Sequence, residues 1–408
     1  MTTAQAESQS LLLQLLDSAN RADPYRICAK IRERGPFQLP QANVAVLSTY
    51  RDCDEVLRHP SSSSDRFKST MTQRLLESGS APRPLGPPGF LFLDPPDHTR
   101  LRRLVSKAFA PKVVNSLQPE IRALVAGFLD RIADKGELEV VDDFAYPLPV
   151  AVICRLLGVP LDDEPRFSRA SALLAQSLDP FAQFTGQLPG GIEERQQTAY
   201  WLREYFRGLI EQRRSRPGDD LLSGLIAVEE SGDQLTQDEI VSTCVLLLIA
   251  GHETTVNLIG NAVLAMLRDR VHWAALAADA ARAPAIVEET LRYDPPVQFV
   301  GRIAADDMTI AGLDVPTGDV MMLLLGAAQR DPSEFDRPDT FDPDRVGLRH
   351  LGFGRGAHYC LGAPLARLEA AVALAAVTAR FPDARLDGEP RYKPNVTLRG
   401  LSELRVAI

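Results

Sequence analysis

Apolar and polar positions alternate with helical spacing over most of the chain. Apolar side chains that return every three or four residues predict amphipathic helices, and this spacing covers five long segments, at residues 119–135, 164–177, 194–213, 236–268 and 362–380. Strand-like runs are few and short, at residues 44–48, 138–141, 308–310, 320–325 and 404–407. This balance predicts a mainly α fold, in which one large helical domain carries small peripheral β-sheets.

The segment 236–268 has the clearest helical signature. Thr236 and Glu239 form a capping-box sequence, in which each side chain bonds a free backbone amide of the first turn. No proline interrupts the segment, so at about 1.5 Å per residue the helix spans roughly 48 Å, the width of a whole domain. Residues 240–250 are apolar on nearly all sides, so the helix should pass through the core.

A polar patch follows within this apolar helix. It reads Ala250-Gly251-His252-Glu253-Thr254-Thr255. An unpaired buried carboxylate is costly in free energy. A sequence that keeps Glu253 there therefore either pairs the carboxylate or uses it.

Breaks along the chain are too short to separate domains. The 408 residues include proline- and glycine-rich loops at 80–96 and 187–191, and we expect an N-terminal extension, residues 1–22, followed by a single domain, residues 23–408. The extension lacks the features of a signal peptide, and the apolar stretch 240–250 is shorter than the about 20 residues that span a bilayer. We therefore expect a cytoplasmic protein. The net charge of −9 opposes general binding to nucleic acid or anionic membranes.

The five cysteines, at positions 28, 53, 154, 244 and 360, have no short spacing. This pattern fits neither a disulfide framework nor a zinc site. We expect Cys28, Cys53, Cys154 and Cys244 to be small buried hydrophobic residues. Cys360 differs from them because of its neighbours.

Cys360 lies in the segment Phe353-Gly354-Arg355-Gly356-Ala357-His358-Tyr359-Cys360-Leu361-Gly362. Glycines at 354 and 356 allow tight or left-handed turns and a close approach to a flat ligand. Cys360 comes just before a predicted helix, whose N-terminal amides and dipole favour a thiolate. A thiolate is the axial ligand with which a heme iron splits O–O bonds.

Two other motifs in these regions are weaker. Gly352, Gly354 and Ala357 match the dinucleotide-binding fingerprint, but no strand precedes them and no βαβ unit follows. His252-Glu253 begins like a zinc-protease motif, but Val256 stands where the second histidine is required. We set both aside.

Four motifs, in the same order along the chain, resemble those of the cytochrome P450 family. Residues 353–362 match its heme-binding signature FGxGxHxCxG, and residues 250–254 resemble its oxygen-activating central-helix motif. Residues 289–292, Glu-Thr-Leu-Arg, look like its ExxR motif, and residues 338–345 resemble the segment that supplies the second arginine of its structural triad. The resemblance extends from about residue 23 to the C-terminus.

The resemblance implies a role for each motif. Glu289 and Arg292, on one helical face, would pair with Arg345 in a structural triad, whereas an isolated ExxR is usually a solvated surface pair. Glu253 and Thr254 would be catalytic, the glutamate as a link to a proton supply and the threonine as a hydrogen-bond donor to bound dioxygen. The implied heme contacts are His98, Arg102, Arg302 and His358 at the propionates, Cys360 at the iron, and Ala250, Phe353, Gly354 and Gly362 around the ring.

The implied cofactor is heme b (iron protoporphyrin IX). The implied function is that of a heme monooxygenase, which uses O2 and NAD(P)H-derived electrons to hydroxylate or epoxidise an apolar small molecule. The sequence has no flavin or nicotinamide motif, so we expect electrons to come from a separate ferredoxin and ferredoxin reductase. An acidic ferredoxin would dock on the cysteine side, at a basic stripe of Arg100, Arg103 and Lys107, with Arg355 and Arg367 nearby.

Two alternatives remain at this stage: a non-catalytic heme-binding sensor or carrier, and a relative that couples phenols or isomerises substrates without inserting oxygen. The resemblance also suggests residues for an apolar substrate pocket, each of which is equally suited to an ordinary core. They are Phe90, Phe92, Phe181, Phe184, Leu246, Ile249, Ala250, Val297, Phe299, Val300, Leu398 and Leu401.

Overall fold

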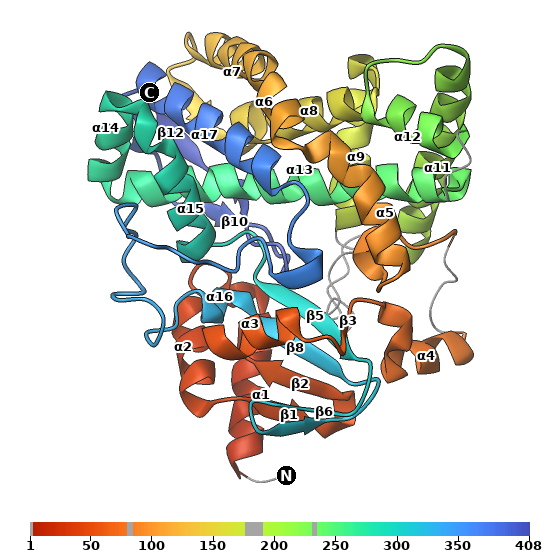
Figure 1. Ribbon diagram of the computed structural model, residues 1–408. Helices are drawn as coiled ribbons and strands as arrows, with labels where there is room; N and C mark the ends of the chain where they lie inside the picture. Colours follow the sequence, from red (N-terminus) through yellow and green to blue (C-terminus); the bar gives the residue numbers. More distant parts are fainter. Residues whose placement is uncertain (1–2, 80–84, 176–190, 231–234) are drawn as a thin grey trace.

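A computed structural model of the chain describes residues 3–79, 85–175, 191–230 and 235–408. The larger part is a body of helices, and a smaller part is built around a five-stranded sheet (Figure 1). The helical body contains α5 (Asp97–Ser106), α6 (Pro111–Ser116), α7 (Gln118–Ile132), α8 (Pro147–Leu157), α9 (Glu164–Ala175), α11 (Ile192–Ser215), α12 (Leu221–Glu230), α13 (Gln237–Arg268), α14 (Arg270–Ala278), α15 (Ala283–Tyr293) and α17 (Ala363–Arg380). The predicted mainly α fold is confirmed.

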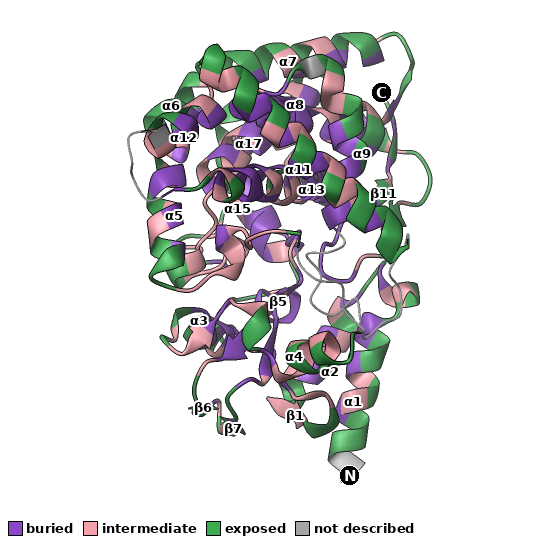
Figure 2. Cartoon of the chain, turned by 90° about the vertical axis from the view of Figure 1, so that its right-hand side faces the viewer, coloured by how far each residue is buried: buried purple, intermediate pink, exposed green. Residues whose placement is uncertain are grey.

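Helix α13 is the axis of this body. Its N-terminus carries the predicted capping box, with Thr236 accepting a hydrogen bond from the Glu239 amide and Glu239 accepting one from the Thr236 amide. The helix packs against α8, α9, α11, α15 and α17, and Figure 2 shows its buried residues inside the helical layers. By length and apolar composition α13 passes as a membrane span, but 72% of that window is buried inside the protein. Its hydropathy is therefore that of a core helix.

The sheet lies beside the N-terminal helices. Its strand order is β1 (Phe37–Leu39), β2 (Val44–Leu47), β8 (Val320–Leu324), β5 (Phe299–Ala304) and β3 (Ser62–Ser63). Strand β2 runs parallel to β8, whereas β5 runs antiparallel to it, with Phe299 opposite Leu324. Around the sheet lie α1 (Thr3–Leu16), α2 (Tyr25–Arg34), α3 (Tyr50–Arg58), α4 (Thr70–Glu77) and α16 (Leu325–Ala328).

Three smaller sheets complete the described structure. They are the hairpin of β10 (Arg391–Tyr392) and β11 (Leu401–Glu403), the hairpin of β6 (Met308–Ile310) and β7 (Leu313–Val315), and the sheet of β4 (Glu137–Glu139), β12 (Arg405–Ala407) and β9 (Arg385–Leu386). The small sheets expected from the sequence are therefore present. Sequence patterning did not identify α1, whose residues Leu12, Leu15 and Leu16 are buried against the five-stranded sheet.

Candidate heme-thiolate site

The cysteine loop enters α17 through two turns. The Gly354 amide donates to the Leu351 carbonyl, and the Cys360 amide donates to the Phe353 carbonyl, both at 2.8 Å. Gly354 and Gly356 have φ of 69° and 68°, a region that favours glycine. A Cβ on Gly356 would lie 2.6 Å from the Leu57 carbonyl oxygen at the end of α3. The glycines therefore let the loop turn and pack directly against another backbone.

The thiol of Cys360 lies at the N-terminus of α17. Burial raises the pKa of this thiol, while the amides of Gly362 and Ala363 and the charges of Arg102 and Arg367 act to lower it. The amides at the helix terminus thus offset only part of the effect of burial on the pKa. The stabilisation of a thiolate expected from the position of Cys360 before a helix is therefore incomplete. Direct coordination to a metal ion deprotonates a thiol outright, which is the state that an iron ligand requires.

The other four cysteines are free and buried, as expected: Cys28, Cys53, Cys154 and Cys244. Burial raises the pKa of each of these thiols. A thiol that stays protonated in apolar surroundings is inert. These cysteines are therefore core residues.

Four nitrogen-bearing side chains from three parts of the chain meet beside the cysteine loop. His98 and Arg102 come from α5, Arg302 from β5 and His358 from the loop itself. The rings of His98 and His358 have their centroids 4.0 Å apart, and an Arg102 Nη2 group donates to the Tyr359 carbonyl. The sequence separated these residues by up to 260 positions, and the fold brings them together.

Among the described residues, no carboxylate forms an ion pair with this cluster. Asp94, whose charge acts on His98, Arg302 and His358, is bonded to Lys68 and Ser63 instead. Both ring nitrogens of buried His98 have no hydrogen-bond partner, and the Arg302 side chain donates only to the Gly301 carbonyl. Burial lowers the pKa of Arg302 to about 10. Burial, together with the neighbouring charges of Arg302, His98 and Arg102, lowers the pKa of His358 to about 3. Buried donors left unpaired are costly, so the cluster is suited to an anionic ligand such as the two propionates of a heme.

On the other side, α13 presents the predicted polar patch. Ile249, Ala250, Gly251 and Thr254 are partly or fully accessible, although the helix around them is buried. The Thr254 hydroxyl donates to the Ala250 carbonyl at 2.8 Å. A Cβ on Gly251 would meet only Ile153 Cδ1, at 3.9 Å. Ala250, Gly251 and Thr254 therefore put small residues on the accessible part of this helix.

Glu253 on α13 is paired. Its Oε1 accepts a hydrogen bond from Lys393 Nζ at 2.6 Å, and the same ammonium lies 3.3 Å from Asn257 Oδ1. The neighbouring His252 contacts Ser171, with 3.3 Å between Nδ1 and the hydroxyl. Burial lowers the pKa of His252 to about 4, so this ring is neutral at pH 7. Sequence reasoning found Glu253 but missed Lys393, because no local pattern links positions 140 residues apart.

The ExxR pair has the buried geometry that its sequence alone left open. Glu289 accepts bonds from Arg292 Nη2 at 2.6 Å and from Nε at 2.9 Å, and both side chains are 0% exposed. Arg345 Nε lies 3.3 Å from Glu289 Oε1, which confirms the predicted triad. Arg292 also donates to the carbonyls of Pro338 and Thr340. The triad therefore fixes the segment that leads to the cysteine loop.

The predicted basic stripe is smaller than expected. Arg100 forms an ion pair with Glu239, with 2.5 Å between Nη2 and Oε1, because α5 packs near the acidic first turn of α13. Arg355 lies 3.5 Å from Asp54, and Arg367 pairs with Glu288 at 2.5 Å. These three arginines are therefore engaged within the protein. Exposed Arg103 and Lys107 have no ion pair among the described residues.

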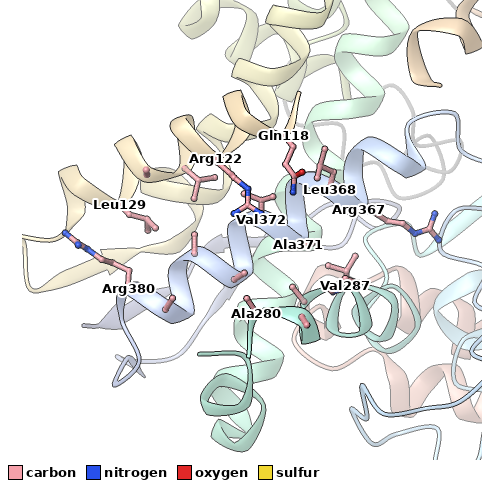
Figure 3. Close-up of a pocket in the computed structure, with 18 of the residues that line it drawn as sticks. Gln118, Arg122, Leu129, Ala280, Val287, Arg367, Leu368, Ala371, Val372 and Arg380 are labelled. Atoms are coloured by element: carbon pink, nitrogen blue, oxygen red, sulfur yellow. The ribbon is translucent and has the colours of Figure 1, made fainter. Parts of the chain in front are cut away.

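A groove of about 870 Å³ lies between α7, α17 and the N-terminal half of α15. Figure 3 shows Gln118 and Arg122 reaching into it from α7, opposite Ala371 and Val372 of α17. Cys360, Glu253 and the four clustered donors do not line it. The groove is therefore separate from the candidate site.

The candidate substrate residues are in different environments. Phe90, Leu246, Phe299, Leu398 and Leu401 are buried in the core. Phe92, Ile249, Ala250, Val297 and Val300 are partly accessible, and Phe181 and Phe184 lie outside the described residues. The accessible members are the stronger pocket candidates.

A helical body, a cysteine loop at a helix N-terminus and a cluster of donors without a paired carboxylate are the features of a heme-thiolate protein. The Cytochrome P450 family model matches residues 10–387. Cytochrome P450 107B1 of Saccharopolyspora erythraea is 38% identical over 97% of both chains. Vitamin D(3) 25-hydroxylase of Pseudonocardia autotrophica is 38% identical over 95% of this chain and 94% of that protein.

A solved structure agrees closely. The ligand-free crystal structure of Mycobacterium smegmatis CYP164A2 has a TM-score of 0.93 and 64% identity, over 98% of this chain and 100% of that one. The chain belongs to the cytochrome P450 family. It is a heme-dependent monooxygenase that uses O2, a redox partner and an apolar substrate. These relationships do not favour a non-catalytic sensor or carrier.

Proposed function

We propose that this monooxygenase hydroxylates or epoxidises an apolar small molecule between α13 and the cysteine loop. Cys360 holds the iron, and His98, Arg102, Arg302 and His358 hold the propionates. Ala250, Phe353, Gly354 and Gly362 border the ring. The observation that carries this assignment is the cluster of donors beside Cys360, in which buried His98 and Arg302 have no ion pair with a carboxylate among the described residues.

Bound heme supplies the redox chemistry that activates oxygen, with the thiolate favouring O–O cleavage. The side chains around it position protons. The Thr254 hydroxyl lies on the accessible face of α13 and can donate a hydrogen bond to dioxygen. Glu253, one residue earlier, transfers protons from solvent towards that hydroxyl. Together they form an acid–alcohol pair, and we assign both residues a catalytic role.

We assign the redox partner to the acidic ferredoxin class, reduced by a ferredoxin reductase with NAD(P)H. Exposed Arg103 and Lys107 follow the propionate-binding residues of α5, and Lys112 and partly exposed Val113 lie on α6. A cationic rim around apolar contacts is suited to an acidic protein. We also propose that the protein acts in the cytoplasm, and its net charge of −9 opposes binding to nucleic acid or to anionic membranes.

We further propose that residues 23–408 act as a single catalytic domain. Residues 1–22 add helix α1, which packs on the sheet. Buried Arg399, near the C-terminus, donates to the Arg21 carbonyl and lies 2.5 Å from Asp294. These contacts tie the two ends of the chain to the end of α15.

The acid–alcohol pair is tested by Thr254→Ala. Loss of the hydroxyl should lower product formed per NAD(P)H consumed by about tenfold, less than the roughly hundredfold that marks the low end for a positioned proton-transfer group, because Glu253 remains. Thr255→Ala is the matched control, because the Thr255 side chain is buried and its hydroxyl makes the same kind of bond, to the Gly251 carbonyl. Coupling that stays at the wild-type value in Thr254→Ala would refute the assignment.

A further inference from the structure

The C-terminal hairpin touches the central helix at its acidic residue. Lys393 follows β10, and its ammonium donates to Glu253 Oε1 at 2.6 Å and lies 3.3 Å from Asn257 Oδ1. Glu253 and Asn257 are one turn apart on α13, so a single lysine contacts both. The contact therefore joins α13 to the C-terminal hairpin, 140 residues away in the sequence.

The hairpin holds Lys393 in place through its backbone. The Lys393 amide donates to the Gly400 carbonyl at 3.0 Å. A Cβ on Gly400 would lie 1.9 Å from Asn257 Oδ1, so a larger residue there would push the hairpin away from α13. Asn261, one further turn along, donates to the Arg399 carbonyl at 3.4 Å. The loop is therefore fitted closely to the helix beside Glu253.

The pair has a buried end and a solvent-facing end. The Glu253 side chain is 9% exposed and the Lys393 side chain 20% exposed. Among the described residues, the other titratable groups whose charges act near Glu253 are His252 and Tyr146. The ring of His252 is neutral, and burial raises the pKa of Tyr146, so neither is charged at pH 7. Lys393 is thus the cation that faces this carboxylate.

We infer that Lys393 is a positioning residue, which holds the Glu253 carboxylate at the inner end of a route from solvent to the Thr254 side of α13. The inference rests on the proposed role of Glu253. A proton that Glu253 passes inward is replaced from solvent at the Lys393 end. Without the ammonium, the nearly buried carboxylate loses its counterion, and an unpaired buried carboxylate is unfavourable. Glu253 then leaves this position.

The test compares Lys393→Met and Lys393→Arg with Arg391→Met as the control. Arg391 lies on the same hairpin, 76% exposed, and pairs with Glu403. Lys393→Met should lower kcat by about tenfold, less than the roughly hundredfold or more that a proton-transfer group itself contributes, because Lys393 only positions Glu253. It should also raise the solvent isotope effect on kcat and leave substrate KM unchanged. Lys393→Arg should restore most of kcat, because a guanidinium also donates to carboxylates.

A second readout does not depend on turnover. Urea midpoints of the purified wild type, Glu253→Gln, Lys393→Met and the double variant form a cycle. We expect the double variant to lose no more unfolding free energy than the less stable of the two single variants. If Lys393→Met does not fold, Lys393→Gln replaces it in both measurements.

Two results would overturn the inference: additive losses in the cycle, or an unchanged kcat and isotope effect in a folded Lys393 variant. Failure of the proposed function would look different. Glu253→Gln would then keep full turnover and coupling, while the urea cycle would still report whether Lys393 and Glu253 are coupled.

Discussion

At the residue scale, the Glu289 carboxylate is held by several hydrogen bonds at once. It accepts bonds from Arg292 and Arg345 and also from the Asp342 amide at 2.8 Å. No part of the side chain is exposed. Breaking a buried pair leaves an uncompensated charge, which costs far more than the loss of a surface pair.

Glu289→Gln should therefore lower the free energy of unfolding by about 3–5 kcal/mol. The control is Arg337→Ala, which removes a 64% exposed partner of Asp342 and should cost less than about 1 kcal/mol. Urea unfolding followed by circular dichroism measures both. Similar losses in the two variants would mean that the buried triad does not stabilise the cysteine side of the fold.

Single residues also show what the sequence left undetermined. The pattern of Glu289 and Arg292 predicts a pair on one face, but only the fold buries it. Glu253 was identified from its place in an apolar helix, yet its partner Lys393 comes from a hairpin near the C-terminus. Partners that are far apart in the sequence are brought together by packing, and no local spacing of residues predicts them.

At the element scale, an ion pair adds to the apolar packing between α15 and α17. Glu288 on α15 accepts bonds from Arg367 Nε and Nη2 on α17, at 2.5 and 2.9 Å, and lies 3.0 Å from His350 Nε2. Burial by itself would raise the pKa of Glu288, but hydrogen bonds from Arg367 and His350 lower it to about 2. Arg367 also donates to the Tyr359 hydroxyl, next to Cys360.

The lowered pKa of Glu288 makes the stability that this contact contributes depend on pH. Because the folded value lies below the ordinary value of 4.5, the carboxylate stabilises the fold above about pH 4.5, and this contribution is lost as pH falls towards 2. Glu288→Gln should remove that part of the acid sensitivity. Urea midpoints at pH 7 and pH 4 should differ less in the variant than in the wild type, and an equal difference in both proteins would contradict the prediction.

Helices were predicted better than strands. The predicted segment 236–268 agrees with α13, Gln237–Arg268, because a capping box and a long apolar pattern define both ends. By contrast, β1 and β5 were not identified, because Phe37–Leu39 is short and Phe299–Ala304 includes Gly301 and Arg302. Arg302 interrupts the strand pattern because it serves the donor cluster.

At the scale of the whole molecule, the proposed site draws on two groups of residues. The cysteine loop and the donor cluster form one group, and the accessible residues of α13 form the other. Cationic Arg103 and Lys107 are exposed on the segment that carries His98 and Arg102. An electron donor bound at this surface would be close to the cysteine side of the heme.

Charge reversal tests this docking surface. Arg103→Glu combined with Lys107→Glu should raise the KM for an acidic ferredoxin by at least about tenfold at low ionic strength, and added salt should reduce the difference. The control is Arg26→Glu with Lys30→Glu on α2, both exposed near the sheet. Equal effects of the two double variants would assign the change to net charge and not to docking.

The central claim is that Cys360 is the thiolate ligand of a heme. The most direct measurement is the absorbance difference spectrum of the dithionite-reduced protein with and without carbon monoxide. We predict a strongly red-shifted Soret band for the wild type, characteristic of a thiolate opposite carbon monoxide, and its loss in Cys360→His that still binds heme. Absence of that band in freshly purified, heme-loaded wild type, or its persistence in Cys360→His, would contradict the account.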